Sequence, residues 1–193
     1  MSNDLQTMKL RDLVTIRKTG LSSYYLNGKD VTIPLINIKD IQGGIISTES
    51  IDRVSIRKTA ALEKSRVNEG DIIISMRGLN FKSAVVDKSA SGFPISSNLV
   101  ALTLSEKIKP EVLAAYFESQ RGQREILARA GGASIKGLTL ETLLNIPIPI
   151  PDPNKQELLS NYLMLAKEYE QIMRKEMELR EKINNAILEQ MMG

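Results

Sequence analysis

The C-terminal part of the chain constrains the fold most strongly. From Lys155 to Met191 the sequence contains no glycine and no proline, and it is rich in glutamate, lysine, glutamine, leucine and methionine. These residue types favour helix, so the segment predicts one continuous helix of roughly 55 Å at 1.5 Å per residue. A helix of that length exceeds the width of a small domain. Its far end must therefore extend beyond the rest of the chain and pack against a partner.

Apolar residues in this helix follow a seven-residue repeat. One core position holds Tyr162, Tyr169, Glu176 and Ile183, and the other holds Leu165, Ile172, Leu179 and Ala186. Glu176 is the single charged interruption. Ala166, Met173 and Ile187 widen the apolar stripe beyond the two core positions. The repeat predicts a coiled-coil helix that dimerises through six large side chains, which are Tyr162, Leu165, Tyr169, Ile172, Leu179 and Ile183.

The part of the chain before this helix has a different pattern. Short β-branched runs, separated by Gly, Asn, Asp and Pro turns, predict strands near 14–16, 31–38, 70–76, 83–87 and 96–104. After Pro110 the apolar spacing becomes helical, and residues 138–144 predict one more short helix. The prolines of "NIPIPIPDPNK" require an extended backbone. The sequence predicts an α+β fold, with a mixed, β-rich domain over residues 1–150 and a long coiled-coil helix over residues 151–193.

Composition restricts the chemistry. The 193 residues include no cysteine and no histidine, which removes thiolate nucleophiles, sulfur-ligated zinc and the commonest general base. The sequence has no phosphate-binding loop, no dinucleotide fingerprint and no nuclease-type carboxylate–lysine motif. We therefore expect no catalysis, no cofactor and no metal site. No apolar run is long enough to span a membrane, and "MSNDLQTMKL" lacks the features of a secretory signal, so we expect a cytoplasmic protein without a membrane partner.

Polar and basic residues are concentrated on the predicted loops. Arginine and lysine pair with phosphates and guanine edges, asparagine pairs with adenine edges, and hydroxyl groups pair with either. The candidate DNA-binding residues are Ser22, Ser23, Tyr24, Tyr25, Arg77, Asn80, Lys82, Ser97, Asn98, Ser134 and Lys136. Several also suit plainer roles, because tyrosines often anchor loops and "SSN" is typical of an ordinary turn. The net charge of +3 is compatible with a polyanionic partner without identifying one.

The segment "VNEGDIIISMRG", residues 67–78, combines a turn, an apolar run and an arginine beside a glycine. The apolar run predicts a strand buried on both faces, which would fix the position of its last residue. Gly78 would let the backbone turn close to a ligand, and Arg77 would be held at a rigid strand end. The alternative is that Gly70 and Asp71 form a simple turn and that Arg77 is a solvated strand terminus.

A resemblance to a known family covers nearly the whole chain. It is carried by "MKLRDLVTIRKTG", "IPLINIKDIQGGII", "VNEGDIIISMRG", "ISSNLVALTL", "KPEVLAAYFESQRGQREI" and "GGASIKGLTLETLLNIPIPIPDPNKQELLSNYL". The last block is the most specific, with a glycine-rich loop, a short helix, a proline ladder, Gln156 and a long helix. Together these segments resemble the specificity subunits of type I restriction-modification systems.

The resemblance implies a function as well as a fold. Residues 1–150 would be a target recognition domain for double-stranded DNA, and residues 151–193 would be the conserved spacer helix. The chain would do no chemistry itself. It would direct a methyltransferase subunit, and through it a restriction and translocase subunit, to a bipartite DNA target.

This chain differs from typical family members in length. Those members hold two recognition domains and two spacer helices, whereas this sequence has one of each, so we expect a homodimer formed through antiparallel long helices. One alternative is a coiled-coil adaptor that binds an acidic partner protein. A stand-alone nuclease or methyltransferase is disfavoured by the missing motifs.

Overall fold

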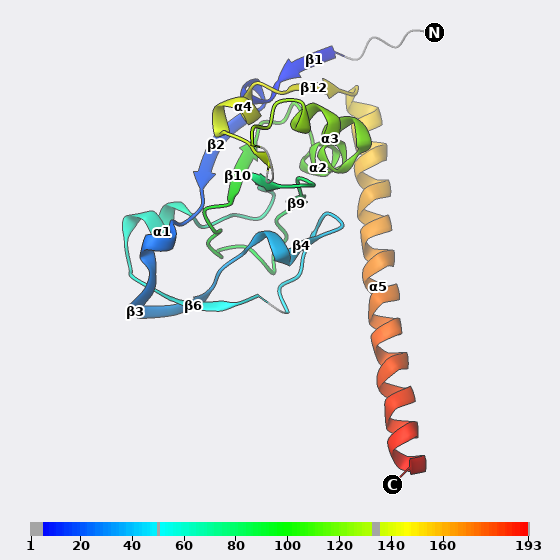
Figure 1. Cartoon of the computed structure of the whole chain (residues 1–193). Helices are drawn as coiled ribbons and strands as arrows, with labels where there is room; N and C mark the ends of the chain where they lie inside the picture. Colours follow the sequence, from blue (N-terminus) through cyan, green and yellow to red (C-terminus); the bar gives the residue numbers. More distant parts are fainter. Residues whose placement is uncertain (1–5, 50, 133–135, 193) are drawn as a thin grey trace.

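The computed structural model describes residues 6–49, 51–132 and 136–192, which form a β-rich head and one long helix (Figure 1). An antiparallel sheet of four strands lies at the centre of the head. Its strands follow the order β2 (Val14–Thr19), β10 (Leu99–Leu104), β7 (Ile72–Ser75) and β9 (Ser83–Val85). The α+β fold with a long C-terminal helix is the one that the sequence predicts.

Strand β7 has hydrogen-bonded neighbours on both edges and apolar clusters on both faces. Ile72 and Ile74 pack in one cluster, and Ile73 packs in the cluster on the opposite face. All three side chains are fully buried. The alternation follows from the two-residue period of a strand, and it confirms the expected strand buried on both faces.

Three helices cover one face of the sheet, namely α2 (Pro110–Glu118), α3 (Gln120–Leu127) and α4 (Leu140–Leu144). Pro110 occupies the first turn of α2, where its missing N–H costs no hydrogen bond. The sharp turn into α3 requires Gly122, because a β-carbon there would lie 1.9 Å from the Tyr116 carbonyl oxygen.

Short elements cover the other side of the head. Strand β3 (Leu26–Pro34) pairs with β6 (Arg53–Ile56), and β4 (Ile41–Gln42) pairs with β5 (Ile45–Ile46). The sequence pattern indicated extended structure here but not the short helix α1 (Ala60–Lys64), which is capped by the preceding threonine. Five residues contain too little apolar periodicity to predict a helix.

The N-terminal strand closes the head beside the long helix. Strand β1 (Gln6–Lys9) pairs antiparallel with β12 (Pro147–Ile150), so the proline ladder lies in a two-stranded ribbon at the margin of the fold. Helix α5 (Pro153–Met192) begins three residues later and extends well past the head (Figure 1).

Gln156 fixes the direction of α5 at its first turn. Its side chain is buried; Oε1 accepts from the Lys109 backbone N–H at 2.9 Å, and Nε2 donates to the carbonyl oxygens of Lys107 and Pro151 at 3.0 and 2.9 Å. Lys109 Nζ lies 2.6 Å from Glu157 Oε2 and lowers the pKa of that carboxyl. These contacts tie the helix to the loop before α2.

The turn between β4 and β5 approaches α5 further along its length. Gly43 lies in the turn between β4 and β5 with a φ of 55°, and a β-carbon on it would lie 3.7 Å from Arg174 Nη2 and 3.8 Å from Glu170 Oε2. The tip of this hairpin therefore lies beside α5. The part of α5 that follows projects beyond the head (Figure 1).

The described flanks of the glycine-rich segment before α4, at Gly131 and at residues 136–137, pair with other backbone segments. Strand β11 (Lys136–Gly137) pairs antiparallel with β8 (Arg77–Gly78), and the Gly131 and Gly137 backbones exchange hydrogen bonds of 2.9 and 2.7 Å. Backbone pairing thus orders both described flanks of this segment.

Candidate nucleic-acid interface

Three chain segments meet where β7 ends and β10 begins. The Met76 N–H donates to the Asn98 carbonyl oxygen at 2.8 Å, and the Leu138 N–H donates to the Met76 carbonyl oxygen at 2.9 Å. Arg77 is paired with Gly137, and Gly78 with Lys136. We call Arg77–Asn80, Ser97–Asn98 and Lys136–Gly137 the loop cluster. Candidate residues that lie far apart in the sequence are therefore neighbours.

Side chains of the loop cluster are available to a ligand. Arg77, Asn80, Ser97 and Asn98 are exposed, and Lys136 is half-buried. Within the described part of the chain, none of these five side chains has a hydrogen bond or an ion pair. The backbone beneath them is paired, so the cluster offers unpaired donors and acceptors at fixed positions. Such groups can bind phosphate oxygens or base edges.

The segment with Ser22 and Ser23 starts beside the loop cluster. The Leu21 N–H donates to the Ile95 carbonyl oxygen at 2.7 Å. A β-carbon on Gly20 would lie 1.8 Å from the Ser96 carbonyl oxygen, so only glycine allows this approach. Ser22 Oγ accepts from the Tyr24 N–H at 3.3 Å and caps a 3-10 turn. The serine hydroxyls are exposed at this turn.

The two tyrosines of this turn have different environments. Tyr25 is half-buried and packs against the cluster of Leu21, Ile56 and Leu62. Tyr24 is 75% exposed, and its ring meets that of Tyr25 edge-to-face at 5.3 Å between centroids. Tyr25 therefore anchors the turn, while Tyr24 presents a ring to solvent. The role of both in DNA binding stays a prediction.

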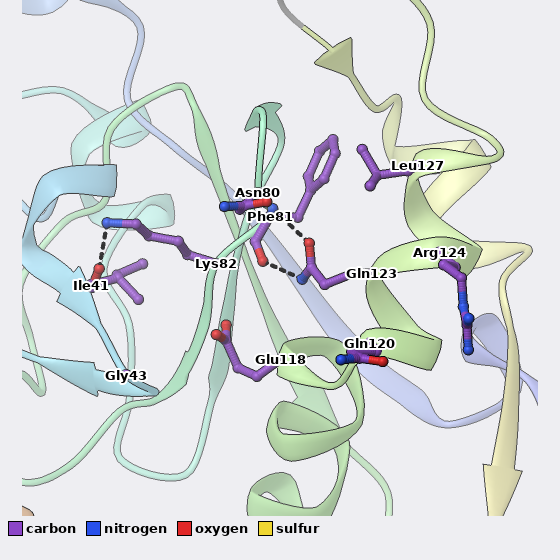
Figure 2. A pocket seen from close by; sticks show the side chains of 10 residues that line it. All are labelled: Ile41, Gly43, Asn80, Phe81, Lys82, Glu118, Gln120, Gln123, Arg124 and Leu127. Carbon is purple, nitrogen blue, oxygen red and sulfur yellow. Dashed lines mark hydrogen bonds between the residues drawn. The ribbon is translucent and has the colours of Figure 1, made fainter.

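Lys82 points away from the loop cluster into the head. Its Nζ donates to the carbonyl oxygens of Ile41 at 2.7 Å and Ile38 at 3.2 Å (Figure 2). The ammonium group thus holds the strand that follows the turn against the β4 region. This geometry gives Lys82 a positioning role, and a DNA contact by Lys82 stays a prediction. Ser134 lies outside the described residues.

A cavity of about 640 Å³ opens beside Asn80 and Lys82 (Figure 2). On its α3 side the Gln123 side chain binds both backbone polar groups of Phe81: Oε1 accepts from the N–H at 3.0 Å, and Nε2 donates to the carbonyl oxygen at 2.6 Å. Sequence reasoning missed Gln123, because a glutamine on a short amphipathic helix gives no sign of a bond formed 42 positions away.

A second groove, of about 1110 Å³, runs between the head and α5 and carries mostly negative charge. Its carboxylates are those of Glu69, Asp87, Glu111, Glu118 and Glu168, with one ammonium group, that of Lys167. Such a surface repels phosphates. Glu69 and Asp87 flank the start of β7 and the end of β9, whereas Arg77 follows the other end of β7. Negative charge therefore lies near one end of the central sheet and the loop cluster near the other, which makes the loop cluster the better candidate for a DNA contact.

The six seam residues of α5 are all exposed along the helix. Tyr162 lies two positions from the buried Ser160, and each position turns the helix by about 100°, so the two side chains point in nearly opposite directions. Most of the seam consequently faces away from the head, while Leu165 also lines the groove between the head and α5. Glu176, the charged interruption, accepts from Arg180 Nη2 at 2.6 Å and from Nε at 3.0 Å in its own helix.

Within the described residues, 6–49, 51–132 and 136–192, no three acidic side chains come together as a possible metal site. No helix in those ranges has the length and apolar character needed to cross a membrane.

Comparison with known proteins identifies the family. Residues 2–189 match the family model of the type I restriction modification DNA specificity domain. Because this match covers almost the whole sequence, the chain belongs to that family. The comparison with curated proteins found no match.

Solved structures share the fold. The S subunit of a type I restriction-modification system from M. genitalium superposes with a TM-score of 0.62 at 18% identity, over 94% of this chain and 44% of that one. The HsdS subunit from Thermoanaerobacter tengcongensis gives 0.61 at 17% identity, over 91% and 40%. A chain from a structure describing assembly of the type I R-M system gives 0.62 at 18%, over 93% and 45%. This chain spans less than half the length of each.

Proposed function

We propose that the chain is a sequence-specific DNA-binding specificity subunit, in which the head reads one half of a bipartite target in double-stranded DNA. The supporting observation is the loop cluster, where unpaired polar side chains stand on a hydrogen-bonded backbone at one end of the central sheet. Membership of a DNA specificity family supports a DNA-binding role for this arrangement. In the proposed role the chain recognises DNA and leaves catalysis to its partners in the cytoplasm.

The partners follow from the same proposal. A methyltransferase subunit would bind the chain, and a restriction and translocase subunit would join through that methyltransferase. One of the similar solved structures comes from a study of complex assembly in the type I R-M system, which is consistent with a role of this chain in a complex. Faces of α5 outside the seam are exposed and leave room for such a subunit.

The second proposed partner is another copy of this chain. The apolar seam is exposed and most of it faces away from the head, so a second α5 can cover it. An antiparallel pair is the arrangement that places two heads at opposite ends. A two-fold contact of this kind presents the same seam on both copies.

This pairing predicts the form of the DNA target. Two identical heads related by a two-fold axis require two identical, inverted half-sites separated by a gap. We expect cells that express the chain with its cognate methyltransferase subunit to methylate adenines in a gapped inverted repeat. Genome-wide mapping of methylated adenines measures the motif. An asymmetric bipartite motif would eliminate the homodimer and would indicate a second, different recognition domain.

The loop cluster predicts two classes of substitution. Arg77→Ala, Asn80→Ala and Asn98→Ala should change the preferred sequence, each with a cost of about 1–3 kcal/mol at its own base pair. Lys58→Ala and Lys88→Ala, which replace exposed cations outside the cluster, should weaken binding slightly and equally on every duplex. Affinity measured on a panel of duplexes would show the difference. Five equal small losses on all sequences would refute this assignment of base-reading residues.

Salt dependence tests the whole proposal against the adaptor alternative. Contacts to phosphates release counterions, so log affinity for duplex DNA should fall steeply and linearly with log salt concentration. An adaptor for an acidic protein would bind DNA weakly and without sequence preference. The family match lends no support to the adaptor.

A further inference from the structure

Leu79 is an exposed leucine at the tip of the Arg77–Asn80 turn. We propose that Leu79 contacts the 5-methyl group of a thymine in the major groove and is therefore a specificity-determining residue. This inference rests on the DNA-reading function proposed above. Leu79 is 74% exposed and lies between Gly78 and Asn80. Single exposed leucines are common on protein surfaces, so the argument depends on how this one is held.

The incoming side of the turn is fixed by backbone pairing. Gly78 is paired with Lys136, and its φ of 142° is a conformation that a side chain would strain. A β-carbon on Gly78 would also lie 3.1 Å from the Asn80 carbonyl oxygen. The turn is therefore tight immediately before its exposed leucine.

The outgoing side of the turn is fixed by a buried ring and by Gln123. The Phe81 ring is 1% exposed, and the Gln123 carboxamide holds both polar groups of the Phe81 backbone, as Figure 2 shows. Gln123 Nε2 also donates to the Phe117 carbonyl oxygen at 2.6 Å, which ties this side chain to α2. Phe81 thus has little freedom to move relative to the helices.

The next two residues return the chain to the sheet through further bonds. The Ser75 N–H donates to the Lys82 carbonyl oxygen at 2.8 Å, and the Lys82 N–H donates to Ser75 Oγ at 2.8 Å. The Ser83 N–H donates to Glu118 Oε1 at 2.5 Å. Leu79 consequently stands on a turn that is held on both sides, and ordering it on binding requires little loss of conformational entropy.

The neighbours of Leu79 indicate what it meets. Arg77 suits guanine and Asn80 suits adenine in the major groove, and neither side chain has a partner in the described part of the head. An apolar side chain between them suits the thymine methyl group, the apolar group that distinguishes a base in that groove. The turn would then recognise bases through an apolar contact to a methyl group and through hydrogen bonds to base edges.

The experiment uses the complex of this chain with its methyltransferase subunit. After the methylated motif is known, each thymine of one half-site is replaced in turn by deoxyuridine, which removes only the methyl group. For the native chain we expect one position at which this replacement raises the dissociation constant about four-fold. That is the change expected when one buried methyl group is lost. Leu79→Ala should weaken binding to the intact site and abolish sensitivity at that position, whereas Leu79→Met should retain it.

Leu158→Ala is the matched control, because Leu158 is 73% exposed but lies on α5, away from the loop cluster. It should keep the native methyl sensitivity. Methyl sensitivity that persists in Leu79→Ala, or a half-site without thymine, would overturn the inference while leaving the DNA-reading function intact. So would a rise in 2-aminopurine fluorescence at one base step that needs Leu79, because it would identify a wedge between base pairs. Failure of the native complex to prefer any sequence would instead refute the proposed function.

Discussion

Leu165→Asp or Ile172→Asp is expected to separate the proposed pair of chains into single chains. Each substitution places an unpaired carboxylate in an apolar contact, and the two-fold axis places a second carboxylate at the symmetry-related position of the same interface. A cost of about 3 kcal/mol raises the dissociation constant more than about 100-fold. Sedimentation equilibrium of native and substituted chains, over a range of concentrations, measures this change.

Met177→Asp is the control for this experiment. Met177 is 68% exposed and Leu165 is 66% exposed, so both substitutions add the same charge at similarly exposed positions of one helix. Met177 lies outside the heptad core positions and should tolerate the charge. A Leu165→Asp chain that stays fully associated would eliminate this seam. Equal dissociation by Met177→Asp would show that charge on any face of α5 is harmful.

The second large effect is expected at Asp71, which is buried at the start of β7. Its carboxylate accepts from Lys18 Nζ at 2.7 Å, from Thr103 Oγ1 at 2.6 Å and from the Asn68 N–H at 2.8 Å. Asp71→Ala leaves the Lys18 ammonium, which is 12% exposed, without its counter-charge. We expect the free energy of unfolding to fall by about 3–5 kcal/mol. Urea denaturation at a fixed chain concentration measures it.

A second ion pair provides the comparison. Glu125 on α3 and Arg129, two residues past its end, are 2.6 Å apart, and about a third of each side chain is exposed. Glu125→Ala removes the same kind of group from a pair that solvent screens, so it should cost less than about 1 kcal/mol. If Asp71→Ala cost no more than Glu125→Ala, the carboxylate of Asp71 would not hold the three strands around it.

Sequence patterns predict the helices and strands whose formation depends on residues that are close together in the sequence. The Gly- and Pro-free segment identified α5, and the Ile72–Ile74 run identified the central strand, because periodicity and burial act on neighbouring residues. The sequence indicates only that Asp71 belongs to the turn before this strand. The sequence around it does not reveal that Lys18 and Thr103 approach from two other strands.

The candidate site depended more on distant pairing. The sequence predicts Arg77 at the end of a buried strand, and the structure places it two residues after β7, in the short strand β8. Strand β8 pairs with Lys136–Gly137, which lies far away in the sequence. Lys82 was grouped with the DNA-binding residues because it follows a polar turn. Its ammonium group is instead bonded to two backbone carbonyl oxygens more than 40 positions away, which no local pattern indicates.

The hairpin tip at Gly43 lies beside α5 near Arg174, about 27 Å along the helix axis from Gln156, and Met192 is about 54 Å from Gln156. If α5 tilts as a rigid body about its first turns, a displacement at the hairpin is doubled at its far end. A shift of a few tenths of an ångström in the β4–β5 turn, which belongs to the same head as the loop cluster, would then move the attachment point that we propose for a second chain by twice that distance.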